Sequence, residues 1–172
     1  MIPRREALRR LGLLGLGVPA APGPVVETEA VTFPGPEGRT LQGAWAAADQ
    51  PAGAVLVIHE NRGLTDHIRS VAGRLDGSGY SALAIDLLSA EGGTAALGDE
   101  AAAMAALSGA PQERFVADMR AGLDELERRA AGQKLGAIGF CFGGGMVWAL
   151  LDAGDPRLAA AIPFYGPAPA AP

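Results

Sequence analysis

The sequence contains few of the residues that catalytic and metal sites most often use. Its 172 residues include one cysteine, two histidines and one lysine. A single cysteine excludes an internal disulfide, and no group of histidine, cysteine and carboxylate residues has the spacing of a metal site. Residues 15–20 fit the pattern G-x-G-x-x-A, but no strand precedes them and Pro19 lies inside, which excludes a dinucleotide site. We therefore expect neither a metal nor a cofactor.

Positive charge and aromatic residues are also scarce. The formal net charge is −5, so the chain has no basic surface of the kind that binds nucleic acid. Aromatic residues make up 5% of the chain against 49% hydrophobic residues, so the core must be mainly aliphatic. A chain of this length and composition is sufficient for one globular domain with a core of its own.

Long apolar runs are absent too. The run Leu11–Val18 has eight residues, whereas a membrane-spanning helix needs about 20, so we expect no stable membrane insertion. Four arginines precede this run and small residues follow it, which is the order of a signal peptide. The pair Arg4-Arg5 resembles a twin-arginine signal. We expect residues 1–21 to be a signal peptide and residues 22–172 an exported domain, periplasmic or extracellular. A cytoplasmic protein with a frayed cationic helix is the alternative.

From residue 25 the chain alternates between segments typical of strands and segments with helical spacing. Ala54–Ile58 is apolar throughout, which indicates a strand buried on both faces. In residues 112–131 the apolar positions recur at helical spacing, with the buried face formed by Phe115, Met119, Leu123 and Leu126. The other expected strands are 25–33, 40–46, 80–85, 135–139 and 158–164, and the other expected helices are 65–76, 99–107 and 142–151. This order predicts an α/β domain with a mostly parallel sheet and helices on both faces.

The cysteine lies in the stretch GAIGFCFGGG, residues 136–145. Only Phe140 and Cys141 separate the expected strand from the expected helix, and so tight a turn predicts strained backbone at Cys141. Gly139 and Gly143 complete the pattern G-x-C-x-G, a nucleophile elbow with cysteine in place of serine. The N-terminus of the following helix favours a thiolate. We interpret Cys141 as a nucleophile, and a buried structural cysteine in a glycine-rich turn is the alternative.

A second motif, HENRGL at residues 59–64, follows the strand 54–58. An α/β-hydrolase has at this position the loop that supplies an oxyanion-hole amide. HENRGL and GFCFGGG, about 80 residues apart, together resemble the dienelactone hydrolase family, as do the stretches at 86–94 and 164–166. The resemblance covers residues 25–166. It implies an α/β-hydrolase fold that lacks its final strands and helices.

The resemblance also implies roles for individual residues. Cys141 matches the nucleophile of the family, and Glu60 matches a glutamate that contacts the resting thiol and helps to activate it when substrate enters. The backbone N–H groups of Asn61 and Phe142 match the oxyanion hole. Arg62 is a candidate to bind an anionic substrate or to brace its loop. For Glu60 the alternative is a surface carboxylate at the end of a strand.

The sequence departs from the family in the residues that would activate the nucleophile. The family's triad Asp and His follow the strand near Phe164, where this chain ends at Pro172. The two histidines present, His59 and His67, match neither position, so we expect a fragment of a longer enzyme that is inactive by itself and has an unpaired apolar strand at 158–164. At position 90 an alanine replaces an arginine with which many relatives bind a substrate carboxylate. A dienelactone is therefore not implied as the substrate.

Three functions fit these observations. The first is a hydrolase that cleaves a small ester or lactone substrate through a cysteine acyl-enzyme. The second is a non-catalytic α/β-hydrolase-like protein that binds a carbonyl ligand. The third is a thiol redox protein, which would need a resolving cysteine or a C-x-x-C motif, and the sequence has neither. We expect the first.

Overall fold

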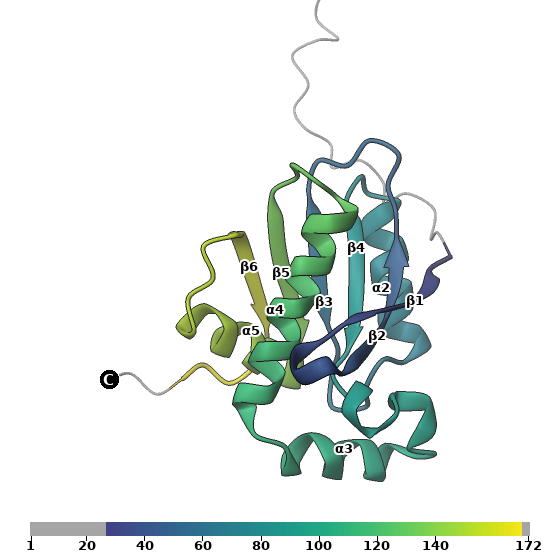
Figure 1. Cartoon of the computed structure of the whole chain (residues 1–172), viewed down its shortest axis with the longest axis vertical. Helices are drawn as coiled ribbons and strands as arrows, with labels where there is room; N and C mark the ends of the chain where they lie inside the picture. Colours follow the sequence, from purple (N-terminus) through teal and green to yellow (C-terminus); the bar gives the residue numbers. More distant parts are fainter. Residues whose placement is uncertain (1–26, 170–172) are drawn as a thin grey trace, which may run out of the picture.

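A computed structural model describes residues 27–169 (Figure 1). The expected signal peptide and the first two residues of the expected strand 25–33 lie outside this range. Six strands form one sheet in the order β1-β2-β4-β3-β5-β6. They are β1 (Glu29–Pro34), β2 (Thr40–Ala46), β3 (Ala54–Ile58), β4 (Ser81–Asp86), β5 (Leu135–Phe140) and β6 (Leu158–Phe164). Among the described residues, no helix has the length and apolarity that crossing a membrane requires.

The sheet is mostly parallel, as the alternation predicts. β2 pairs antiparallel with β1 on one side and with β4 on the other. β3 pairs in parallel with β4 and β5, and β5 pairs in parallel with β6. The carboxyl ends of these four strands therefore meet at one edge of the sheet, which is where open α/β sheets bind their ligands.

Helices cover both faces of the sheet. α2 (Asp66–Asp76) packs on β2, β3 and β4, while α4 (Gln112–Arg129) and α5 (Phe142–Asp152) lie on the opposite face. α3 (Glu100–Gly109) lies below the sheet in Figure 1. Three short 3₁₀ turns complete the described part: η1 (Pro36–Gly38), η2 (Ser89–Glu91) and η3 (Thr94–Ala96).

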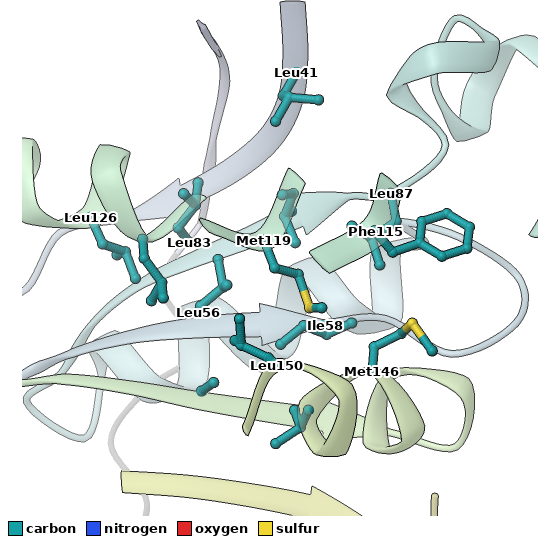
Figure 2. Packing of buried hydrophobic residues seen from close by; sticks show 14 of the residues in the cluster. Leu41, Leu56, Ile58, Leu83, Leu87, Phe115, Met119, Leu126, Met146 and Leu150 are labelled. Atoms are coloured by element: carbon teal, nitrogen blue, oxygen red, sulfur yellow. The ribbon is translucent and has the colours of Figure 1, made fainter. Parts of the chain in front are cut away.

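The larger core lies between the sheet and the helices α4 and α5. All four residues expected to form the buried face of α4 are at most 2% exposed. Figure 2 shows Met119 and Leu126 of α4 over Leu56 of β3, with Leu150 of α5 beside them. Each side chain buried to this extent stabilises the fold by about 1.5–3 kcal/mol.

The second core lies under α2. Ile68, Val71 and Ala72 of this helix pack against small residues of the sheet, among them Ala82 and Ala84 of β4. Val57 of β3 belongs to this core, whereas its neighbours Leu56 and Ile58 belong to the first. This division explains the uninterrupted apolar run, because alternate residues of β3 face different helices.

α2 does not extend over the outer strand β6. An apolar groove of about 510 Å³ remains on this face, with Tyr80, Ile138 and Ile162 in its lining. Ile162 is 49% exposed and Phe164 44% exposed. Within residues 27–169, β6 is the outermost strand on its side of the sheet. It is the exposed apolar edge strand that the sequence predicts.

The ends of some elements differ from the expectations. Thr65 precedes α2 but its side chain makes no capping hydrogen bond, whereas Asp99 caps α3 by accepting the N–H of Ala102 at 2.8 Å. α3 therefore begins at residue 100 rather than 99 and extends to 109. β5 continues through Phe140, which the sequence predicts to lie in the turn, because Phe140 pairs with Phe164 of β6.

Candidate active site

Cys141 is the single residue between β5 and α5. Its backbone has φ 53° and ψ −114°, so the strain expected from the tight turn is present. Two hydrogen bonds hold this conformation: the N–H of Cys141 donates to the carbonyl of Phe164 at 3.1 Å, and its carbonyl accepts from Gly145 at 3.1 Å. Such a backbone conformation costs about 1–3 kcal/mol and is concentrated at functional sites.

Two glycines allow strand and helix to meet at this turn. A Cβ on Gly139 would lie 2.1 Å from the carbonyl oxygen of Gly143. A Cβ on Gly143 would lie 2.4 Å from the carbonyl oxygen of Ile58 and 2.5 Å from that of His59. No side chain fits into these contacts. The glycines therefore bring the start of α5 against both β5 and the end of β3.

This close approach brings the two expected oxyanion-hole segments together. Phe142 is the first residue of α5, so its N–H has no acceptor within the helix. Its ring stacks on His59 with a centroid distance of 6.3 Å and meets Phe115 edge-on at 5.4 Å. Asn61 lies in the turn that follows His59. Both expected amides therefore lie on segments that border the turn containing Cys141.

The loop 59–64 is fixed at its far end by Thr94. The hydroxyl of Thr94 accepts the N–H of Leu64 at 2.8 Å and donates to Asp86 Oδ1 at 2.9 Å. The other carboxylate oxygen of Asp86 accepts the backbone N–H of Thr94 at 2.7 Å. Asp86 is the last residue of β4 and is buried. It thus links the loop of the HENRGL motif to the loop that follows β4.

His59 fixes the near end of the same loop. Its Nε2 accepts the N–H of Leu87 at 3.1 Å, so the proton must be on Nδ1, which donates to the carbonyl of Glu60 at 2.6 Å. The side chain is fully buried, and burial lowers the pKa of His59. Asp86 Oδ1 is 4.0 Å from Nε2, too far for a hydrogen bond. With both nitrogens occupied and no charge, His59 is placed to hold the loop and not to take a proton from Cys141.

The remaining predicted residues lie at or near this edge. Glu60 is half-buried and accepts a hydrogen bond from the hydroxyl of Tyr165 at 3.0 Å. Arg62 is exposed and forms an ion pair with Glu100, the first residue of α3, at 3.0 Å. This contact matches the bracing interpretation of Arg62, although an exposed pair stabilises little. His67 is exposed on α2.

The structure adds residues that the motif analysis did not assign. Thr94 and Tyr165 lie in stretches that the sequence linked to the family without giving them a role. A signal for Asp86 was available, because a carboxylate at the end of a buried strand is unusual unless it is hydrogen-bonded. Within residues 27–169, no three His, Cys, Asp or Glu side chains lie together as a metal site would require.

Known proteins are similar to this chain in sequence and in fold. The model of the dienelactone hydrolase family matches residues 41–172. A protein of Escherichia coli K12 named "Putative carboxymethylenebutenolidase" is 32% identical over 69% of this chain and 44% of its own length. A Bradyrhizobium protein named "Probable 2-oxo-3-(5-oxofuran-2-ylidene)propanoate lactonase" is 33% identical over 66% of this chain and 45% of its own length. The chain thus spans less than half the length of these relatives.

A solved structure shares the fold. The crystal structure of a dienelactone hydrolase-like promiscuous phosphotriesterase from metagenomic libraries superposes with a TM-score of 0.67 and 29% identity, over 83% of this chain and 61% of that one. One conclusion follows from the strand order, from the strained residue between β5 and α5, and from the family match over most of the chain. The chain belongs to the dienelactone hydrolase family and has the α/β-hydrolase fold.

Proposed function

We propose that this chain carries the nucleophile of a hydrolase that opens small ester or lactone substrates through Cys141. The observation that carries the proposal is the backbone of Cys141, strained at φ 53° between β5 and the N-terminus of α5. A structural cysteine needs no such conformation. The turn also places Cys141 at the N-terminus of α5, where a helix carries a positive electrostatic potential.

The reaction begins with an attack on the carbonyl carbon of the substrate. The sulfur of Cys141 forms a C–S bond, and the electrons of the C=O bond move to the oxygen. The N–H groups of Phe142 and Asn61 are the candidate donors to this oxyanion, each worth on the order of 3 kcal/mol. Collapse of the tetrahedral species breaks the C–O bond, and the departing alkoxide takes up, through solvent, the proton that the thiol gave up. With a lactone this oxygen remains attached to the acyl group. Water then hydrolyses the thioester, which yields the acid and restores the thiol.

The second half of this cycle requires a base to activate water. The chain has two histidines, of which His59 uses both ring nitrogens in the loop and His67 is exposed on α2. We therefore expect the 172-residue chain to be acylated once and to release the acyl group slowly. A rate of only about 10³–10⁴ over water would remain from the oxyanion hole and substrate binding.

The test is a burst experiment with p-nitrophenyl acetate. We expect one p-nitrophenolate per chain at most, a slow phase after it, and a mass increase of one acetyl group. The Cys141→Ala variant should give neither burst nor adduct. A burst that persists in Cys141→Ala would refute the nucleophile, and fast multiple turnover by the chain itself would refute the roles given to His59 and His67.

One observation favours a second function, a binding protein without catalysis. The hydrogen bonds of His59 occupy both of its ring nitrogens, and His67 is exposed on α2, so neither histidine in residues 27–169 is placed as a base for Cys141. Such a protein would bind a carbonyl ligand at the same edge without forming a thioester. The acetyl adduct on Cys141 separates the two functions, because the binding protein would not show it.

We further propose that residues 1–21 direct export through Arg4 and Arg5. Fusing residues 1–26 to a reporter tests this point. The reporter should be exported by the wild-type segment and retained in the cytoplasm when both arginines are lysine. Unchanged export of the double variant would contradict a twin-arginine signal.

A further inference from the structure

Arg114, in the first turn of α4, has no role in the site described so far. Its side chain is only 19% exposed, and its guanidinium forms an ion pair with Glu91 at 2.6 Å. One terminal nitrogen also donates to the carbonyl of Leu87 at 3.4 Å. Its Nε is buried and has no hydrogen-bond partner within residues 27–169. A buried donor without a partner is costly, so hydrogen bonding alone does not explain where this guanidinium lies.

A stack of rings supplies the explanation. The central carbon of the Arg114 guanidinium lies over the ring of Phe115, 4.8 Å from its centroid. Phe115 meets the ring of Phe142 edge-on at 5.4 Å, and Phe142 stacks on His59 at 6.3 Å. A planar guanidinium is suited to lie on the face of an aromatic ring. Arg114 is thus the outer member of a stack that leads to the first residue of α5.

A second route leads from Arg114 to the same residue. The carbonyl of Leu87 accepts the hydrogen bond from Arg114, and the N–H of Leu87 donates to Nε2 of His59 at 3.1 Å. His59 in turn stacks on Phe142. The contacts therefore form a closed ring through Arg114, Phe115, Phe142, His59 and Leu87. In a closed ring each member is held from two sides, so the ring of Phe142 has little room to move.

We infer that Arg114, through its contact with Phe115, is a positioning residue that keeps the backbone N–H of Phe142 directed at the oxyanion of the reaction. The inference rests on the proposed function, in which this N–H is an oxyanion donor. Phe142 directly follows the strained Cys141, and its N–H has no acceptor within α5, so its side-chain contacts help to fix its orientation. An oxyanion donor is effective only within hydrogen-bond distance of the oxygen that gains charge.

Two reactions of the same thiol separate this role from a general loss of structure. Acylation by p-nitrophenyl acetate passes through an oxyanion, whereas iodoacetamide alkylates the sulfur by displacing iodide from a tetrahedral carbon, without an oxyanion. Both rates rise with the fraction of thiolate. The ratio of the acylation rate to the alkylation rate therefore reports on the oxyanion hole. Cys141 is the only cysteine of the chain, and Cys141→Ala gives the background of both reactions.

The variants are Arg114→Met and Arg114→Lys, with Arg120→Met as the matched control. Arg120 also lies on α4, but it donates to the carbonyls of Ala153 at 2.7 Å and Gly154 at 3.1 Å, at the far end of α5. Arg120→Met thus removes a contact between α4 and the end of α5 while leaving the start of α5 in place. Circular dichroism and the urea midpoint verify that each variant is folded.

Arg114→Met should lower the acylation rate by roughly threefold to tenfold, a part of the about 10²–10³ that complete loss of an oxyanion donor costs. Its alkylation rate should stay within about twofold of wild type, so the ratio falls. Arg114→Lys keeps the charge but has no planar group to lie on Phe115, so its ratio should fall as well. Arg120→Met should keep the ratio of wild type.

Three outcomes overturn the inference alone. The first is a folded Arg114→Met variant with the ratio of wild type. The second is a wild-type ratio in Arg114→Lys, which also decides the matter if Arg114→Met does not fold. The third is an equal fall in Arg120→Met, which would mean that any loosening of α5 has this effect. If p-nitrophenyl acetate leaves no acetyl group on Cys141 of the wild-type chain, the proposed function fails and this inference fails with it.

Discussion

Replacing Gly139 by alanine tests the elbow most directly. The added Cβ would lie 2.1 Å from the carbonyl oxygen of Gly143, 2.4 Å from its carbonyl carbon and 2.9 Å from Cγ2 of Val147. Two of these atoms belong to the backbone of α5, so no side-chain rotation can relieve the contact. Either β5 or the first turn of α5 must move by roughly 1 Å to reach an ordinary contact distance.

The expected cost follows from two opposing effects. Overpacking of a rigid core costs about 1–3 kcal/mol, and more when the backbone must shift. A glycine replaced without strain would instead stabilise the chain by about 0.4–1 kcal/mol. We expect a net loss of about 3 kcal/mol or more from Gly139→Ala. For a domain with a total stability of about 5–15 kcal/mol, this is a large and measurable fraction.

The assay combines urea unfolding with alkylation of Cys141. Gly139→Ala should lower the midpoint of unfolding and alter the native alkylation rate, because any shift of α5 displaces the cysteine. Gly109→Ala is the control, since Gly109 ends α3 and a Cβ there would meet nothing within 4 Å. It should be as stable as wild type or up to about 1 kcal/mol more stable. If Gly139→Ala stays within about 1 kcal/mol of wild type and keeps the alkylation rate, the packing argument for the elbow is wrong.

Three further predictions address the residues around the elbow and the ion pairs of the fold. Thr94→Val should cost about 1–3 kcal/mol in urea unfolding, because Leu64 and Asp86 lose their hydrogen bonds to the hydroxyl of Thr94. Thr94→Ser keeps the hydroxyl and should be close to wild type, and equal losses in the two variants would refute the role of the hydroxyl. Burial lowers the pKa of His59, so the unfolded chain binds a proton at a higher pH than the folded chain, and the free energy of unfolding should fall below about pH 6.5 by up to 1.4 kcal/mol per pH unit. In urea unfolding as a function of pH, His59→Gln should flatten this slope, whereas His67→Gln should leave it unchanged. Hydrogen bonds from Arg157 lower the pKa of Asp155, so the stabilisation by its carboxylate is present above about pH 3.9 and is lost as the pH falls through the lowered pKa of the folded state. Urea unfolding should therefore show Asp155→Asn to be less stable than wild type at pH 7, and the difference should shrink below about pH 4.

Most of the elements could be predicted because their signals are local. The apolar run 54–58 and the helical spacing of Phe115, Met119, Leu123 and Leu126 give the strand and the helix that the structure contains. Strain at Cys141 could be predicted because only two residues separate the expected strand from the expected helix. The boundary at Phe140 was wrong, because pairing with Phe164 of β6 extends β5 by one residue, and no property of Phe140 itself indicates this partner.

The contacts among site residues depend on tertiary structure. Glu60 and Tyr165 are 105 residues apart and Leu64 and Thr94 are 30 apart, so neither hydrogen bond leaves a periodic pattern in the chain. The sequence alone could not show that His59 has both ring nitrogens occupied, or that Arg62 pairs with Glu100. Local spacing determines secondary structure because side chains three, four or two residues apart share a face. The edge where β3, β4, β5 and β6 end is assembled from four distant segments, and only their packing in the sheet decides which side chains meet there.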